Sequence, residues 1–171
     1  MLVFDLETDG LLADVTKVHC LCIFDTMSET MFTFDSAKNN IEEGIELLNV
    51  AELIVGHNVI NYDLPVLEKL YGFKPREERV QDTLLLSRLI YGDLSEMDAR
   101  FIAQHTLDNK LYKSHSLKAW GQRLSTSKFE QKGELDMSDA DVRANLTPEM
   151  IEYCEQDVRV TAKLMKYFEG K

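Results

Sequence analysis

The chain has 171 residues and a formal net charge of −11 at pH 7, with 44% hydrophobic and 29% charged residues. This length gives one domain room for a sizeable core, and the composition is that of an ordinary globular protein rather than a disordered or fibrous one. No apolar run approaches the ~18 residues of a membrane span, and acidic residues interrupt the amino-terminal apolar stretch, so neither a span nor a signal peptide is expected.

Apolar periodicity in the first half of the chain predicts four strands and two helices. The predicted strands cover residues 2–7, 18–24, 30–34 and 53–56. The predicted helices cover residues 40–50 and 63–71. Residues 26–29 join the second and third strands as a hairpin. The fourth strand is expected to run parallel to the first, because a helix separates it from the hairpin.

The second half is predicted to be mostly helical. A short strand at residues 80–81 leads into a helix that Asp82 or Thr83 caps. Residues 92–114 lack clean periodicity and predict short helical pieces, residues 117–124 predict a helix, and the polar stretch 125–146 predicts an exposed insertion. Thr147 and Pro148 are typical of a helix start, and one apolar stripe then continues to about residue 170. The pattern as a whole predicts a single α/β domain over residues 1–171, a mixed sheet of five strands flanked by helices.

The cysteines and histidines show no pattern of a zinc site or of a disulfide framework. Cys20 and Cys22 alternate on a predicted strand, where positions i and i+2 are poorly placed for a disulfide, and Cys154 lies in the last helix. Reduced, buried cysteines in a cytoplasmic protein are therefore expected. The histidines at positions 19, 57, 105 and 115 have no zinc-ligand spacing.

Carboxylates occur in the first strand and in the last helix. Asp5 and Glu7 are two residues apart, so they project from the same side of a strand, ~7 Å apart along it. Tyr153 and Asp157 are four residues apart in a helix and share one face. Two carboxylates on a buried strand are costly unless a positive charge compensates them, and hard divalent cations take oxygen ligands. A metal site is the leading explanation.

Residues 53–63 complete a set of three segments that resembles the motifs of the DEDD 3′–5′ exonucleases. The motifs are Asp5-x-Glu7-Thr8, Asn58 followed by Tyr62-Asp63, and Tyr153-x-x-x-Asp157. The tyrosine is similar to that of the DEDDy branch, which includes the proofreading domains of family A DNA polymerases. Residues 1–7, 81–89 and 114–124 further resemble the amino-terminal exonuclease domain of podovirus-type phage polymerases.

The resemblance implies a ribonuclease H-like fold and a catalytic set that binds two divalent cations, Mg²⁺ or Mn²⁺. Asp5, Glu7 and Asp157 would hold the metal that activates water. Asp5 would also reach the second metal, whose water shell Asp63 would fix, and Tyr153 would orient the attacking water. The four positive charges of two such ions would offset the acidity of the chain where a phosphate must sit.

By the same resemblance, Thr8 and Leu11 would cradle the terminal nucleotide, and Asn58 and Tyr62 would line the substrate. Leu11 could instead only close the loop after the first strand, and Tyr62 could be core filler. Trp120 is expected to pack beneath its helix, with base stacking as the alternative. Five basic residues form either a solvated helix face or a phosphate track. They are Lys113, Lys118, Arg123, Lys128 and Lys132.

The expected activity is hydrolysis of single-stranded or frayed DNA from the 3′ end, releasing nucleoside 5′-monophosphates. The expected partners are the DNA 3′ end and a DNA polymerase domain or replication proteins, in the host cytoplasm if the chain is phage-encoded. A DEDDy exoribonuclease of the ribonuclease D type is one alternative. A degenerate exonuclease domain that only binds nucleic acid or docks a polymerase is another. A stand-alone enzyme and an excised polymerase domain both fit a chain that ends just past its last helix.

Overall fold

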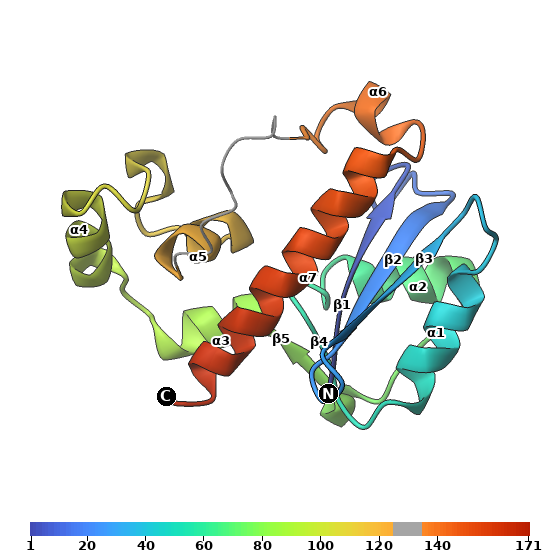
Figure 1. Ribbon diagram of the computed structural model, residues 1–171, viewed down its shortest axis with the longest axis horizontal. Helices are drawn as coiled ribbons and strands as arrows, with labels where there is room; N and C mark the ends of the chain where they lie inside the picture. Colours follow the sequence, from blue (N-terminus) through green and yellow to red (C-terminus); the bar gives the residue numbers. More distant parts are fainter. Residues whose placement is uncertain (125–134) are drawn as a thin grey trace.

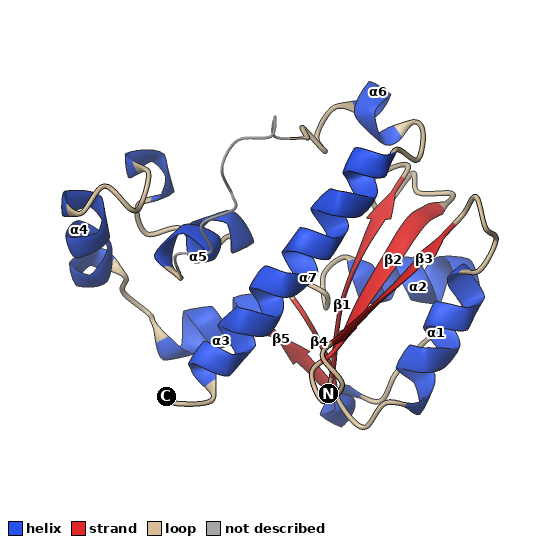
Figure 2. Cartoon of the chain, viewed as in Figure 1, coloured by secondary structure: helices blue, strands red, loops and turns tan. Residues whose placement is uncertain are grey.

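A computed structural model of the chain describes residues 1–124 and 135–171 (Figure 1). In this part of the chain, one five-stranded mixed sheet has the strand order β3-β2-β1-β4-β5 (Figure 2). The strands are β1 (Leu2–Thr8), β2 (Val18–Asp25), β3 (Thr30–Asp35), β4 (Ile54–Gly56) and β5 (Val80–Asp82). The predicted α/β fold with a mixed sheet of five strands is confirmed.

β1 lies in the centre of the sheet, antiparallel to β2 and parallel to β4. Its register places Asp5 opposite Cys22 and Glu7 opposite Cys20. Directly opposed residues of neighbouring strands point to the same face, so two carboxylates and two thiols share one side of the sheet. The pairing becomes irregular between Glu7 and Thr8, where the strand leaves the regular ladder.

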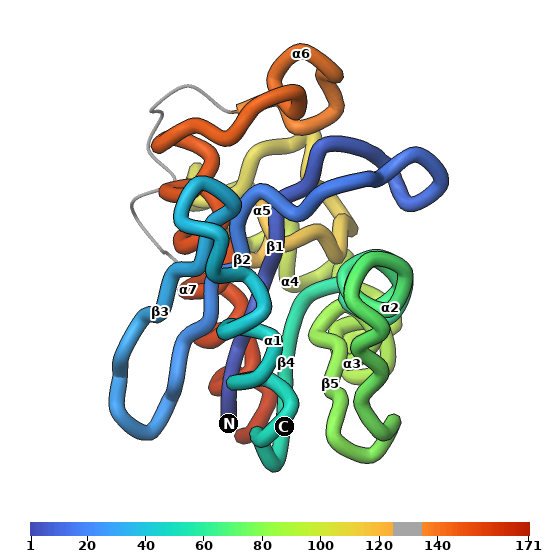
Figure 3. The backbone as a smooth tube through the Cα atoms, turned by 90° about the vertical axis from the view of Figure 1, so that its right-hand side faces the viewer, coloured from blue at the N-terminus to red at the C-terminus, as the bar shows by residue number. Residues whose placement is uncertain are grey.

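Helices cover both faces of this sheet. They are α1 (Ile41–Val50), α2 (Asp63–Tyr71), α3 (Thr83–Ile90), α4 (Ser95–Ala103), α5 (Leu117–Arg123), α6 (Ala140–Arg143) and α7 (Pro148–Phe168), with single 3₁₀ turns at Glu77–Arg79 and Asn109–Leu111. Side chains of α1 and α2 pack with Phe4, Leu6 and Leu21 on one face. Side chains of α7 pack with Val3, Cys20 and Val55 on the other face. Figure 3 views the chain from the side of α1 and α2.

The long helix α7 begins as predicted. The Thr147 hydroxyl accepts a hydrogen bond of 3.1 Å from the Met150 N–H, and Pro148 occupies the first turn. The cap satisfies one of the backbone donors that a helix start leaves unpaired. The predicted stripe is buried, including Met150, Cys154, Val158 and Phe168. Tyr153 and Asp157 are half-buried on its flank.

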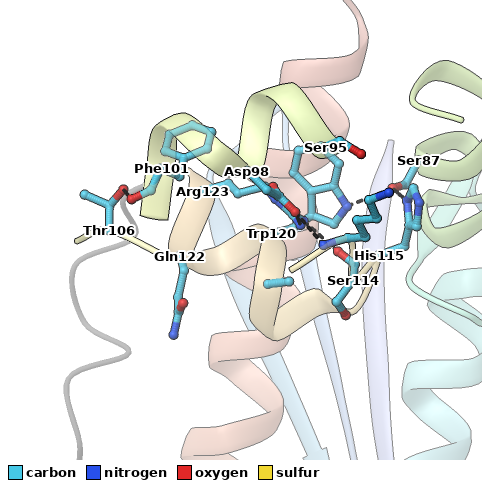
Figure 4. Close-up of polar contacts among 12 residues, drawn as sticks. Ser87, Ser95, Asp98, Phe101, Thr106, Ser114, His115, Trp120, Gln122 and Arg123 are labelled. Atoms are coloured by element: carbon cyan, nitrogen blue, oxygen red, sulfur yellow. Dashed lines mark hydrogen bonds and ion pairs between the residues drawn. The ribbon is translucent and has the colours of Figure 1, made fainter. Parts of the chain in front are cut away.

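Residues 92–114 contain the short helix α4 and a single 3₁₀ turn, in agreement with the short helical pieces that were predicted. Asp98 is the fully buried residue of α4, so the helix has no apolar stripe that periodicity could reveal. Asp98 instead forms a buried ion pair with Arg123 of α5 (Figure 4), with side chains 0% and 1% exposed and a shortest N–O distance of 2.7 Å. The Arg123 side chain is therefore not part of a solvated face or a phosphate track.

The region predicted as an exposed insertion, 125–146, is described from residue 135 onward. Most residues between 135 and 146 are exposed, but Leu135, Met137 and Leu146 pack in part against the core beneath α7. The His19 Nε2–H of β2 donates to the Arg143 carbonyl over 2.7 Å, which anchors α6 to the sheet. Lys128 and Lys132 lie outside the described residues. No helix in the described ranges is long and apolar enough to cross a membrane.

Candidate active site

The structure brings the four predicted carboxylates together where β1, the start of α2 and the middle of α7 meet. Asp5 and Glu7 project from β1, Asp63 is the first residue of α2, and Asp157 lies in α7. The negative charges of Asp63, Glu7 and Asp157 each raise the pKa of Asp5, so the four carboxylates lie close enough to interact electrostatically. Residues up to 152 positions apart in the sequence thus form one acidic cluster.

Backbone contacts position two of these carboxylates. The backbone N–H groups of Asp63 and of Leu6 in β1 face the Asp63 carboxylate and lower its pKa, against the larger effect of burial. The Cys154 thiol of α7 donates to the Asp5 carbonyl over 3.4 Å. Cys154 lies one residue after Tyr153 and three before Asp157, so this contact helps to fix the position of both side chains along β1.

Burial and mutual repulsion hold protons on this cluster. Burial is the largest cause that raises the pKa of Asp5 and of Glu7 well above the ordinary value. The next largest causes are the charge of Asp63 for Asp5 and that of Asp157 for Glu7. Burial also raises the pKa of Asp63 and of Asp157 to about 7. The cluster therefore favours whatever supplies positive charge, either protons or metal ions.

Tyr153 is kept as a neutral donor by the same environment. Burial, followed by the charges of Asp157 and Glu7, raises the pKa of the Tyr153 hydroxyl far above its usual value of 10.0. The hydroxyl acts as a hydrogen-bond donor to Asp157 and so opposes the rise in the pKa of that carboxyl. A phenol held in this state can donate hydrogen bonds at neutral pH but cannot remove a proton from water.

The donor set fits hard divalent cations. Within the described ranges, no lysine, arginine or histidine forms an ion pair with any of the four carboxylates. Within those ranges, one set of three potential metal ligands from acidic, cysteine or histidine side chains has its ligand atoms within 4.8 Å of one another. This set is the sulfurs of Cys20, Cys22 and Cys154, in the core between β2 and α7. No three of the four carboxylates have oxygens within this distance of one another, so a cation that takes three of them as ligands requires side-chain movement. Buried carboxylate oxygens without a cationic partner are the ligands that Mg²⁺ and Mn²⁺ take.

Two of the predicted substrate residues meet at the loop after β1. The Thr8 hydroxyl donates to the Gly10 carbonyl over 2.9 Å and makes a short contact with the Tyr62 hydroxyl. Tyr62 also donates to the Gly10 carbonyl over 2.6 Å. Leu11 is 62% exposed at the tip of this loop. Tyr62 thus ties this loop to the start of α2 while its ring packs in part against the core. The exposed Leu11 side chain is available to a ligand.

Asn58 lies at the end of β4 with a φ of 65°, in the left-handed region that a residue other than glycine seldom adopts. Its N–H donates to the Asp82 carboxylate over 2.9 Å. Asp82 also caps α3, as predicted, by accepting from the Leu84 and Leu85 N–H groups. Asn58 is thus held beside the carboxylate cluster by a residue from the neighbouring strand.

Trp120 packs beneath α5, as predicted. Its indole is 1% exposed and donates to the Ser87 hydroxyl over 2.8 Å, so the ring is not available to stack on a base. Arg123 lies over this ring as well as against Asp98.

A cavity of about 490 Å³ adjoins Asn58, and periodicity did not predict it. Its lining comes from the ends of β4 and α3 and from the turn before α5. The lining residues are His57, Asn58, Leu84, Arg88, Lys113, Ser114, His115, Ser116 and Leu117. The sequence did contain one indication of this cavity: its lining residues Arg88, Ser114 and His115 lie inside two of the segments that resemble the phage exonuclease domains.

Comparison with known proteins assigns the chain to a family. The model of a family described as 3′-5′ exonuclease matches residues 1–171. The chain belongs to this exonuclease family. It is 34% identical to the DNA-directed DNA polymerases of Escherichia phage T7 and of Enterobacteria phage T3, in alignments that span 97% of this chain and 26% of each polymerase. The chain thus spans about a quarter of the length of these relatives.

A solved structure described as the apo form of a nuclease has the same fold as this exonuclease domain. The TM-score is 0.66 at 17% identity, over 99% of this chain and 71% of that one. At this identity the likeness concerns the fold alone.

Proposed function

We propose that this exonuclease domain hydrolyses the terminal phosphodiester bond of single-stranded or frayed DNA from the 3′ end, releasing nucleoside 5′-monophosphates. The observation that carries the proposal is the cluster of Asp5, Glu7, Asp63 and Asp157, in which Glu7 and Asp63 are buried and the other two half-buried. The cluster has no cationic partner in the described residues. These residues stand in the order of the family motifs. DNA is favoured over RNA because the similar phage proteins are DNA polymerases.

Two bound Mg²⁺ or Mn²⁺ ions would supply the Lewis acidity that activates water and stabilises the departing 3′ oxygen. Asp5, Glu7 and Asp157 would hold one ion. Asp5 would reach the other, whose water ligands Asp63 would orient. Metal binding requires deprotonated carboxylates, and the raised pKa values of Asp63 and Asp157 disfavour that state in the metal-free chain. Metal affinity should therefore fall at low pH.

The remaining residues would position water and substrate. The Tyr153 hydroxyl, neutral at working pH, would donate to Asp157 and to the attacking water. Leu11 would contact the terminal base from its exposed loop. Thr8 and Tyr62, joined through Gly10, would fix the position of that loop beside the cluster.

The partners that we propose are the 3′ end of a DNA strand and a DNA polymerase domain, acting in the cytoplasm of a phage host. The association with a polymerase is supported by the relatives, in which the matched region is 26% of a DNA polymerase. Proofreading of newly made 3′ ends is the corresponding role.

The test is a time course on matched single-stranded DNA and RNA oligonucleotides that carry a 5′ label. The expected result with Mg²⁺ is a ladder that shortens one nucleotide at a time, fastest on DNA, with 5′-monophosphates as the product. A 3′-phosphorylated strand should resist, and a circular strand should stay intact. Undiminished hydrolysis in excess chelator would refute the two-metal mechanism. Faster loss of RNA would indicate an exoribonuclease, and no hydrolysis with either metal would indicate a binding module.

A further inference from the structure

We propose that Cys20, Cys22 and Cys154 form a three-sulfur site that binds one trivalent arsenic atom, and that an occupied site slows hydrolysis. The three sulfur atoms lie within 4.8 Å of one another in the core between β2 and α7. The site itself does not depend on the proposed function, because its ligands are thiols outside the carboxylate cluster. Only the effect of the bound arsenic on hydrolysis rests on that function.

Two elements of the fold bring the three thiols to one point. Cys20 and Cys22 are two residues apart in β2, so their side chains point to the same face of the sheet. The long helix α7 packs on that face, and Cys154 is one of its buried residues (Figure 1). All three are free cysteines, and each is 0% exposed. A strand and a helix thus hold three soft ligands together in the core.

The spacing of the sulfurs fits three bonds to one central atom. Three sulfurs that are each bonded to a common atom at ~2.3 Å, the length of a zinc–sulfur bond, lie ~4 Å apart or closer. The thiols start within 4.8 Å of one another, so they need to approach by on the order of 1 Å. Rotation of the cysteine side chains and a small shift of α7 toward β2 can supply this approach.

The charge and polarity around the thiols favour a trivalent centre. Val3, Val55 and Met150 belong to the same apolar cluster as the thiols. The carboxylates of Asp5 and Glu7 project from the same side of the sheet. A divalent cation with three thiolate ligands keeps one negative charge, which is costly in an apolar core beside other negative charges. Trivalent arsenic with three thiolates is neutral.

The binding step exchanges hydroxyl groups for thiols and involves no redox change. Arsenous acid, As(OH)₃, is an uncharged molecule near neutral pH. Three As–O bonds and three S–H bonds break, three As–S bonds and three O–H bonds form, and three water molecules leave. Arsenic remains trivalent, so the step needs no oxidant or reductant. The product carries neither a charge nor an oxygen atom, which suits an apolar core.

A hydrogen bond between the sheet and α7 lies next to the thiols. Thr33 of β3 pairs with Cys22 of β2, and its hydroxyl donates to the carboxylate of Glu155 over 2.6 Å. Glu155 directly follows Cys154 in α7, and both Thr33 and Glu155 are partly exposed. Arsenous acid must enter where α7 separates from the sheet, since the thiols themselves are covered. Formation of the adduct should therefore be slow.

Bound arsenic would alter the contact between α7 and β1. The Cys154 thiol donates to the Asp5 carbonyl over 3.4 Å, and this bond is lost when the thiol proton leaves. Tyr153 and Asp157 lie within one turn of Cys154 on the same helix, so they move with it. A misplacement of ~1 Å in an active site can lower the rate about a hundredfold. We therefore expect the adduct to hydrolyse DNA slowly.

The first test is native mass spectrometry with sodium arsenite in anaerobic buffer without added thiols. The folded wild type should gain one arsenic atom, lose three hydrogen atoms and retain no oxygen from the reagent. Cys20→Ala, Cys22→Ala and Cys154→Ala should each bind about a hundredfold more weakly, because the third bond is formed by a ligand already held in place, and their adducts should retain a hydroxyl group. Val55→Ala is the matched control: it shortens another buried side chain of the same cluster, keeps all three thiols and should bind like the wild type.

The second test follows hydrolysis of a 5′-labelled single strand with Mg²⁺. The wild-type rate should fall about a hundredfold as the adduct forms. Excess Mg²⁺ should not restore the rate, because arsenic and Mg²⁺ bind different residues, whereas a competing dithiol should restore it. At the arsenite concentration that half-saturates the wild type, Cys154→Ala should keep the rate that it has without arsenite.

The proposal is overturned if the folded wild type forms no oxygen-free adduct, or if the cysteine variants bind arsenic as tightly as Val55→Ala does. Recovery of the rate with excess Mg²⁺ would place arsenic at the carboxylates and would also overturn it. An adduct that hydrolyses DNA at the unmodified rate would refute the effect on α7. Failure of the proposed function is distinguishable, because the wild type would then not hydrolyse the strand even before arsenite is added, while the mass of the adduct still decides the site.

Discussion

The Asp82 carboxylate at the end of β5 accepts a hydrogen bond of 2.9 Å from the backbone N–H of Asn58, 24 positions earlier in the chain. The same carboxylate accepts from the Ile60 N–H at 3.2 Å and from the Leu84 and Leu85 N–H groups. One side chain thus starts α3 and holds the β4–α2 loop. That loop leads to Asp63, so Asp82 links the sheet edge to the carboxylate cluster.

Replacing Asp82 should therefore reduce both stability and activity. Asp82→Ala leaves several buried or half-buried N–H groups without an acceptor, and we expect a loss of ~2–4 kcal/mol in the free energy of unfolding. Activity at a temperature where the variant is folded should also fall, because Asn58 and Asp63 lose their anchor. Urea denaturation measures the first effect. Asp108→Ala, which removes an exposed cap that accepts from one N–H, is the control and should cost less than ~1 kcal/mol. Equal losses for the two variants would contradict the anchoring role.

Divalent cations should stabilise the folded chain. Ions that bind the folded carboxylate cluster and not the unfolded chain raise the free energy of unfolding by ~2.7 kcal/mol at a concentration of 100 times Kd. Thermal melting with Mg²⁺ or Mn²⁺ against excess chelator measures the shift. Asp5→Ala should melt at the same or a higher temperature than the wild type in chelator, because it relieves like-charge repulsion, and should gain little from metal. A wild-type melting temperature that does not respond to either metal would count against the site.

The metal-free chain should lose stability as pH rises from about 4 to about 7. Asp63 and Asp157 have pKa values raised from 3.8 to about 7, so the folded state keeps protons that the unfolded state has released across this interval. Stability is then greatest below the unfolded pKa and falls as pH passes through the folded pKa. Asp157→Asn removes one of these groups, so in chelator its stability should decline less over the same interval. Urea denaturation of both proteins at a series of pH values is the measurement, and parallel curves would refute the assignment.

Asp5→Ala and Tyr153→Phe should differ in severity. Asp5 is assigned to both metals, so its loss should lower the single-turnover rate by roughly 10³-fold or more, as Lewis-acid stabilisation is worth several kcal/mol. Tyr153→Phe removes a hydrogen-bond donor worth ~1–3 kcal/mol, which corresponds to about ten- to a hundredfold, with metal binding nearly intact. If the phenylalanine variant is the more damaged of the two at saturating Mg²⁺, then tyrosine has a role in proton transfer that its raised pKa argues against.

Local patterns in the sequence determined most of the elements. Strand alternation placed Asp5 and Glu7 on one side of β1, and the Thr147-Pro148 start and apolar stripe of α7 appear as predicted. The capping of α3 by Asp82 was likewise predicted from the residues next to it in the sequence. These features depend on neighbours within a few positions, whose spacing and backbone preferences are written directly in the sequence.

Only the tertiary structure showed the contacts between distant residues that neither periodicity nor the family resemblance predicted. The sequence shows Asp98 and Arg123 as two charged residues of separate segments, and only the packing of α4 on α5 makes them a buried pair. The contact of Tyr62 with Thr8 and Gly10 and the cavity between Arg88 and Lys113 likewise join segments that are far apart in the chain. Such contacts depend on how complete elements pack against one another, a sum over many side chains that no local pattern contains.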